Sequence, residues 1–219
     1  HEDFFLSVFR RLSGSSEEYV RTTAAECLYT YYIQQEQYDR AEECLACFST
    51  QNPERKRKQA LLYARKGQVE EAYKAYEELL FSGYQLLNTV LQSMLSMRLQ
   101  AKELEKADYL AEKTIELIRL FEMGRYHEAT VSLEMAQARE DVEETLRCAE
   151  ELAAYVGEIS SFRDALLYEH MSFREVSDEF REEMQERLEA LFLEEEGFGY
   201  MKGHERWECF LREKLWRRG

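Results

Sequence analysis

Residues 28–45, LYTYYIQQEQYDRAEECL, and residues 60–81, ALLYARKGQVEEAYKAYEELLF, share one pattern of tyrosines, small residues and aliphatic residues. In each stretch a helix with apolar periodicity ends in a short polar segment, and a second helix follows with an alanine in its first turn. These alanines, Ala41 and Ala72, lie 31 positions apart. The pattern predicts a helical hairpin that recurs along the chain.

A hairpin that recurs near this period resembles the tetratricopeptide repeat, a unit of about 34 residues with the pattern W-x₂-L-G-x₂-Y, A-x₃-F and Pro. This chain departs from the family because no tryptophan opens a repeat. The resemblance implies an all-α, tetratricopeptide-like helical-repeat solenoid, a right-handed superhelix of antiparallel helix pairs. We expect an N-terminal apolar helix over 1–16, repeats over 17–157, and a C-terminal capping helix pair over 158–219.

Composition supports an all-helical chain. Pro53 is the only proline, whereas average usage of about 5% would give many more. Period-two runs of β-branched residues between turn residues, which indicate strands, do not occur. The fold class predicted from composition is therefore all-α.

A few residues predict the helix boundaries. Asn52-Pro53 should start a helix, Gly67 should reverse the chain, and Ser82-Gly83 should end the helix that begins at Val69. Beyond these, we predict helices over 84–99, 104–123, 162–168, 173–196 and 205–217, a helix capped by Asp141, and a reversal at Gly124 that matches the one at Gly67. Counted along the chain, the helix before Gly124 is the second helix of the third pair, but its motif is that of the first helix of a new pair. The assignment of these helices to repeats three and four, the phase of the repeats, therefore stays open.

The charge of the chain excludes some functions. A net charge of −15 should repel nucleic acids and anionic membranes. No apolar run approaches the roughly 18 residues of a membrane span, and we expect a cytoplasmic protein. Because the chain opens with His1 rather than Met, we expect a domain to precede it.

Candidate chemistry is sparse. Cys44 and Cys47 form a C-x-x-C, but the pair lies inside a predicted helix with no second pair and no nearby histidine, which favours a structural role. No histidine has an acidic residue three positions before it, as di-iron bundles require, and no phosphate loop or hydrolase motif occurs. We predict no enzyme activity, no metal and no cofactor.

Binding residues are predicted from the repeat geometry, because the first helix of each pair lines the concave surface of such a stack. The basic run Arg55–Lys58 reads as a solvated helix face, with Arg57 a candidate for the groove. Amide and guanidinium side chains can bind the backbone and carboxylates of an extended peptide. The candidate groove residues for a peptide or protein partner are Gln34, Arg57, Arg65, Asn88 and Gln92, each of which could equally be plain surface.

The C-terminal half carries a further resemblance. The run Gly124-Arg125-Tyr126-His127-Glu128-Ala129, then Leu167-Tyr168-Glu169-His170-Met171 and the long segment from Phe173, resembles the C-terminal helical-repeat regions of XRE-type helix-turn-helix regulators from Firmicutes. The resemblance implies the sensing or dimerising part of a bacterial transcription regulator whose DNA-binding domain comes first.

Two functions of different classes follow. One is a regulatory module that binds a partner, or forms a homodimer through the aromatic residues Phe4, Phe9, Trp207 and Trp216, and so controls a DNA-binding domain. The alternative is a general protein-protein adaptor unrelated to transcription. The same aromatic residues could instead cap the two ends of the stack.

Overall fold

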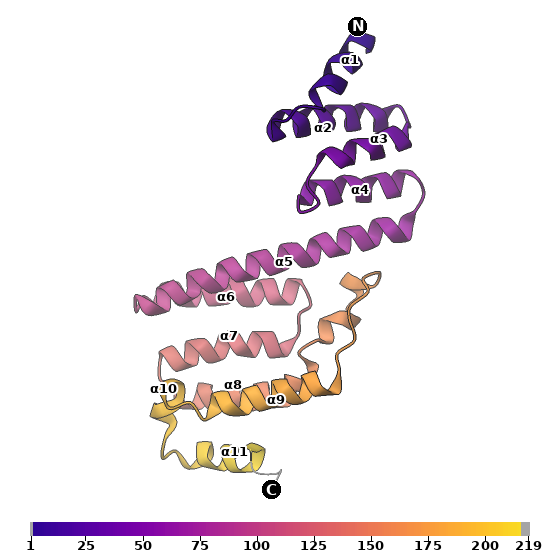
Figure 1. Cartoon of the computed structure of the whole chain (residues 1–219). Coiled ribbons are helices and arrows are strands. Elements are labelled where there is room, and N and C mark those ends of the chain that lie inside the picture. The colour runs from indigo at the N-terminus through magenta and orange to yellow at the C-terminus, as the bar shows by residue number, and fades with distance from the viewer. Residues whose placement is uncertain (1, 216–219) are drawn as a thin grey trace. The chain divides into compact units, whose positions relative to one another are not determined.

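The computed structural model describes residues 2–215, without the side chains of residues 2, 3, 196, 214 and 215, and every element in this range is helical (Figure 1). The predicted all-α class is confirmed for these residues. The first elements are α1 (Glu2–Leu12), α2 (Glu18–Gln34), α3 (Tyr38–Cys44) with the 3₁₀ turn η1 (Leu45–Cys47), α4 (Pro53–Arg65) and α5 (Val69–Gln100). After these come α6 (Leu104–Leu120), α7 (Arg125–Ala138), α8 (Val142–Tyr155), the 3₁₀ turns η2 (Val156–Glu158), η3 (Ser161–Asp164) and η4 (Leu166–Tyr168), α9 (Asp178–Phe192), α10 (Glu195–Phe198), η5 (Gly199–Met201) and α11 (Glu205–Leu215).

The chain divides into two compact units, His1–Ser82 and Gly83–Gly219. The boundary lies inside α5, so this helix contributes its first half to unit 1 and its second half to unit 2. In unit 1, α2 packs against α1 and α3, and α3 packs against α4. In unit 2, α7 packs between α6 and α8, and α9 and α11 cover α8. The division into segments 1–16, 17–157 and 158–219 stays a prediction.

One type of reversal joins four pairs of consecutive helices. In each, a residue with positive φ follows the end of the first helix, and the second helix starts two residues after it. The positive-φ residues are Glu36, Gly67, Lys102 and Glu140. The N–H after each donates to a carbonyl five residues earlier, as from Gln37 to Tyr32 at 2.9 Å and from Gln68 to Tyr63 at 2.9 Å. This is the Schellman arrangement, which satisfies the last carbonyls of a helix and turns the chain back at once.

A small buried residue follows each of these reversals at the same offset. Four residues lie three positions after the start of the second helix and are almost fully buried: Ala41, Ala72, Ala107 and Thr145. A short side chain here lets the backbones of the two antiparallel helices approach closely. Ala129 in α7 is buried as well.

The reversal predicted at Gly124 is built differently. Glu122, with φ 53°, takes the left-handed position, and Met123 donates to the carbonyl of Ile118 at 3.0 Å. Gly124, with φ 96°, comes two residues later and precedes α7. The predicted match with Gly67 was wrong, because the link from α6 to α7 is one residue longer than the other reversals. By turn type, α6 therefore pairs with α5, and α7 pairs with α8.

The predicted break at Ser82-Gly83 does not occur, since α5 is one unbroken helix of 32 residues (Figure 1). The Ser82 hydroxyl donates to the carbonyl of Glu78 at 2.8 Å, within its own helix. Gly83 does not have positive φ, and a Cβ built there would meet nothing within 4 Å. A glycine inside a helix costs only about 1 kcal/mol relative to alanine, which good helix formers on both sides can offset.

Two predicted helices near the C-terminus also differ. Residues 162–168 form the turns η3 and η4 instead of an α-helix, and α9 begins at Asp178 rather than near Phe173. The Ser177 hydroxyl accepts from the N–H of Phe180 at 3.2 Å and so caps α9. Phe173 packs edge-on against Phe162, with ring centroids 5.4 Å apart. This aromatic contact holds the segment before α9 in a non-helical conformation.

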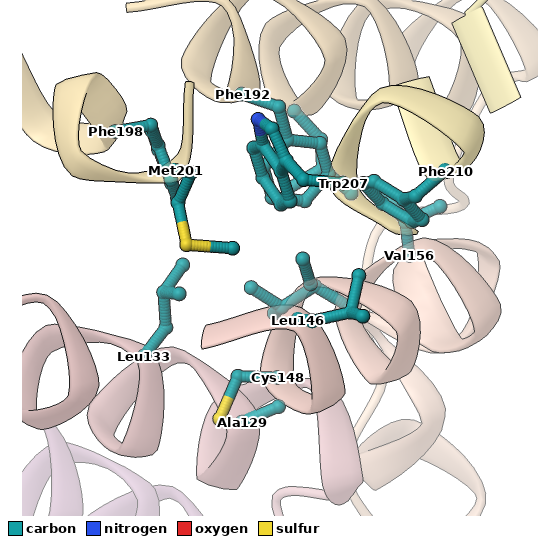
Figure 2. Close-up of a cluster of buried hydrophobic side chains, with 13 residues drawn as sticks. Ala129, Leu133, Leu146, Cys148, Val156, Phe192, Phe198, Met201, Trp207 and Phe210 are labelled. Atoms are coloured by element: carbon teal, nitrogen blue, oxygen red, sulfur yellow. The ribbon is translucent and has the colours of Figure 1, made fainter. Parts of the chain in front are cut away.

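The last helices complete a core over α7 and α8 (Figure 2). Trp207 stacks on Phe198 and Phe210, at centroid distances of 5.2 and 5.3 Å. Leu146 and Met201 are buried in the same cluster. Two segments about 60 residues apart in sequence thus share one core.

The two glycines of α5 and its preceding turn make a matched test. Gly67→Ala should lower the free energy of unfolding by about 1 kcal/mol, because a Cβ in the left-handed conformation is strained. Gly83→Ala should raise it by about 0.5–1 kcal/mol, because alanine favours a helix interior. Urea denaturation measures both values. Destabilisation by Gly83→Ala, at a concentration where the chain is monomeric, would contradict the continuous α5.

Candidate functional site

The predicted groove residues fall in different units. Gln34, Arg57 and Arg65 belong to unit 1, where all three are exposed, and Asn88 and Gln92 belong to unit 2. The Oδ1 atom of Asn88 is buried with no hydrogen-bond partner in the described part of the chain, and Gln92 is half-buried. The five residues together therefore remain a prediction, and the three in unit 1 form its exposed part.

In unit 1, Arg57 and Arg65 lie in the electrostatic field of Tyr29. Burial raises the pKa of the Tyr29 phenol to about 12, nearby Tyr76 raises it further, and the two guanidinium groups oppose this shift. The Tyr29 hydroxyl donates to the carbonyl of Lys58 at 2.5 Å, which joins α2 to α4. Arg57 itself forms a two-atom contact with the Glu54 carboxylate, at 2.7 and 3.0 Å. A peptide carboxylate would have to displace Glu54 to bind the Nε and Nη2 atoms of Arg57.

The basic run Arg55–Lys58 is engaged within unit 1. Arg55 donates to the carbonyl of Phe48 at 3.4 Å, and Lys56 forms an ion pair with Glu78 at 2.5 Å. Lys58 is buried, which differs from the predicted solvated face. Tertiary packing turns this one cation inward while its neighbours stay on the surface.

Lys58 is held by both charge and aromatic faces. Its ammonium lies 2.7 Å from the Glu26 carboxylate, and it sits over the rings of Tyr29 and Phe48 at 5.5 and 5.8 Å. A buried cation is tolerated only with such compensation. The charge therefore stabilises the packing of α2 on α4 and is not available to a ligand.

The predicted aromatic interface residues have different environments. Phe4 is 74% exposed on α1, whereas Phe9 is half-buried and stacks near Phe5 with centroids 4.5 Å apart. Trp207 is buried in the core of unit 2, so its ring offers no surface to a partner. Trp216 lies outside the described residues.

The C-x-x-C pair has the properties of structural cysteines. Cys44 and Cys47 are both free thiols, and burial raises the pKa of Cys44 to about 11. A raised pKa leaves the thiol protonated near neutral pH, the opposite of a reactive thiolate. Within residues 2–215, no group of three or more histidine, cysteine or acidic side chains is placed to hold a metal ion.

The most prominent surface feature is one that the sequence interpretation missed. Exposed apolar side chains follow one face of α5 at alternating spacings of four and three residues. The first half of the helix contributes Val69, Tyr73, Tyr76 and Leu80, and the second half contributes Leu87, Val90, Met94 and Met97. We call these eight residues the α5 stripe.

The α5 stripe is exposed along its whole length. Its members have between 38% and 68% of their surface accessible, while Leu95 and Tyr84 of the same helix are buried. Alternating steps of four and three keep side chains on one side of a helix, as in coiled coils. A row of large apolar side chains in water marks a contact surface.

The polar side chains of α5 do not interrupt the stripe. The hydroxyls of Thr89 and Ser93 each donate, at 2.8 Å, to the carbonyl four residues earlier in the helix. They therefore place no unsatisfied donor at the surface beside Val90 and Met94. The spacing of the apolar residues is visible in the sequence. The break expected at Ser82-Gly83, however, assigned these residues to two separate helices, so the continuous row was not predicted.

Charge is distributed unevenly along α5. Residues 69–82 contain four glutamates and one lysine, whereas residues 83–102 contain no acidic residue, with Arg98 and Lys102 near the end. In a chain with a net charge of −15, twenty residues without an acid are unusual. The first half of the stripe thus lies in an acidic segment, and the second half lies in a segment without acidic residues.

Comparison with protein-family models, with curated proteins and with solved structures finds no match to this chain. Among the described residues, no helix has the length and apolarity needed to cross a membrane. The function therefore has to be argued from the surfaces described above.

The environment of Lys58 gives a test with a matched control. Lys58→Ala should lower the free energy of unfolding by about 2 kcal/mol, because it removes a buried stem and a cation between two rings. Lys56→Ala removes a half-exposed ion pair on the same helix and should cost less than about 0.5 kcal/mol. Chemical denaturation of both variants measures the two losses of unfolding free energy. Equal, small losses would show that Lys58 is not buried in solution.

Proposed function

We propose that this chain is a non-enzymatic association module of the tetratricopeptide-like type, a right-handed stack of antiparallel helix pairs. The recurring three-residue reversals and the small buried residue after each support this architecture. In such a stack each pair buries its apolar face only against its neighbours, which leaves long helix faces for partners.

The observation that carries the proposal is the α5 stripe. Apolar residues such as Leu87, Val90 and Met97 remain exposed on a helix whose opposite face is packed. Exposed apolar rows bind protein surfaces, whereas phosphate backbones require cationic ones. A protein is therefore the expected partner, with the exposed Arg57, Arg65 and Gln34 of unit 1 as a second candidate surface for a peptide.

We further propose that the module is the C-terminal regulatory part of a DNA-binding transcription regulator. The resemblance of residues 124–129 and 167–171 to the helical-repeat regions of XRE-type regulators supports this role. DNA contact is assigned to the preceding domain, since the acidic charge of this chain disfavours it.

The coding sequence upstream of His1 tests the regulatory role. We expect it to encode a helix-turn-helix domain in frame, and the extended protein should shift a labelled duplex from its own promoter region in a mobility assay. This chain alone should leave the duplex unshifted. An unrelated upstream domain, or an extended protein that binds no DNA, would overturn the regulatory role and favour the adaptor.

A further inference from the structure

We propose that the α5 stripe is a homodimer seam, occupied by α5 of a second copy that runs antiparallel to the first. This inference rests on the proposed association role and names its partner. Three properties of α5 carry it: the spacing of the stripe, the distribution of charge along the helix, and the small residue near its middle.

The spacing fits another helix better than an extended peptide. Steps of four and three residues, sustained from Val69 to Met97, are the pattern that lets two helices interlock side chains over several turns. At about 1.5 Å per residue, the 32 residues of α5 extend for about 48 Å. An extended strand repeats every two residues and would match only scattered members of the row.

The charge distribution selects the antiparallel orientation. Two copies in parallel would place the glutamate-rich first halves beside each other and the basic ends beside each other. Antiparallel copies place Glu70 and Glu71 of one chain near Arg98 and Lys102 of the other. Arg98 already pairs with Glu103 in its own chain, so the charges act mainly by penalising the parallel alternative.

The middle of the stripe suits a close crossing. Gly83 occupies the position in the four-three spacing between Leu80 and Leu87, and nothing lies within 4 Å of where its Cβ would be. In the antiparallel pair, Leu87 packs onto Gly83 of the partner subunit and Leu80 packs against Val90 of the partner subunit. The same contacts recur on the other side of the two-fold axis, as an isologous interface requires.

Light scattering over a concentration series, from about 1 to 100 µM, tests the dimer with matched variants. The unmodified chain should have the mass of two copies, and Leu87→Glu with Met94→Glu should have the mass of one. Leu166→Glu is the control, because Leu166 is 82% exposed on η4 and is not a member of the stripe, and its variant should stay dimeric. Thermal melts of all three should show that each is folded.

Three outcomes would overturn the seam. They are a monomer at every concentration, a dimer that survives the double substitution, or a dimer that is lost instead with Phe4→Glu on α1. The regulatory role fails separately: a monomer with a helix-turn-helix frame upstream overturns only the seam, and a dimer with no such frame overturns only the regulatory role.

Cross-linking with a short bismaleimide tests the orientation. Gln68→Cys and Gln100→Cys lie near opposite ends of α5 and are exposed, and both are made with Cys209→Ser to lower the background. A mixture of the two variants should give a cross-linked dimer, whereas neither variant alone should. The chain with only Cys209→Ser controls for the other native cysteines. Efficient self-cross-linking of Gln100→Cys would mean a parallel pair and overturn the antiparallel seam.

Discussion

The paired helices depend on one backbone constraint, a residue held at positive φ with a single residue between it and the next helix. A connection this short leaves the second helix no path except back along the first. It also aligns the same point of every second helix with its partner. That point is where Ala41, Ala72, Ala107 and Thr145 lie, and their small side chains allow the contact. Backbone geometry at four residues thus selects side-chain size at four others.

The unbroken α5 is the exception that generates the candidate site. A helix that ended at Ser82 would present two short apolar faces in different directions. One that continues through Gly83 aligns them into a single row, because the spacing of apolar residues is preserved across the glycine. The surface feature therefore follows from a local event, the choice of right-handed helical backbone at one residue.

Part of this arrangement could be predicted from sequence, where residue type alone determines the backbone. Asn52 caps α4 ahead of Pro53, Gly67 has φ 77°, and Asp141 accepts from the N–H of Glu144, all as predicted. Glu122 could not be found in this way, because glutamate is a poor indicator of left-handed backbone and the nearby Gly124 is a better one. The residue type and the backbone conformation disagree at Glu122 because tertiary packing overrides the intrinsic conformational preference of glutamate.

The candidate site shows the same limit. Exposure of the row on α5 could not be predicted once a break was expected in its middle, although the spacing of Leu80, Leu87 and Val90 is plain in the sequence. Trp207 could not be distinguished from an interface residue, since a tryptophan on an amphipathic helix suits either role. Lys58 was indistinguishable from its three basic neighbours until the rings around it were known. In each case the deciding information lies in contacts between distant segments.

The four charged residues at positive φ have a meaning for how this sequence can change. Glu36, Lys102, Glu122 and Glu140 adopt φ between 52° and 57°, a conformation that costs an L-residue about 1–2 kcal/mol. Their side chains are exposed, so replacement by glycine or asparagine would disturb little packing. The chain thus retains strain at four surface positions that single substitutions can relieve. Relief of this strain at one turn would raise the stability of the fold. The added stability could then offset a destabilising substitution elsewhere, including one that reshapes a binding surface.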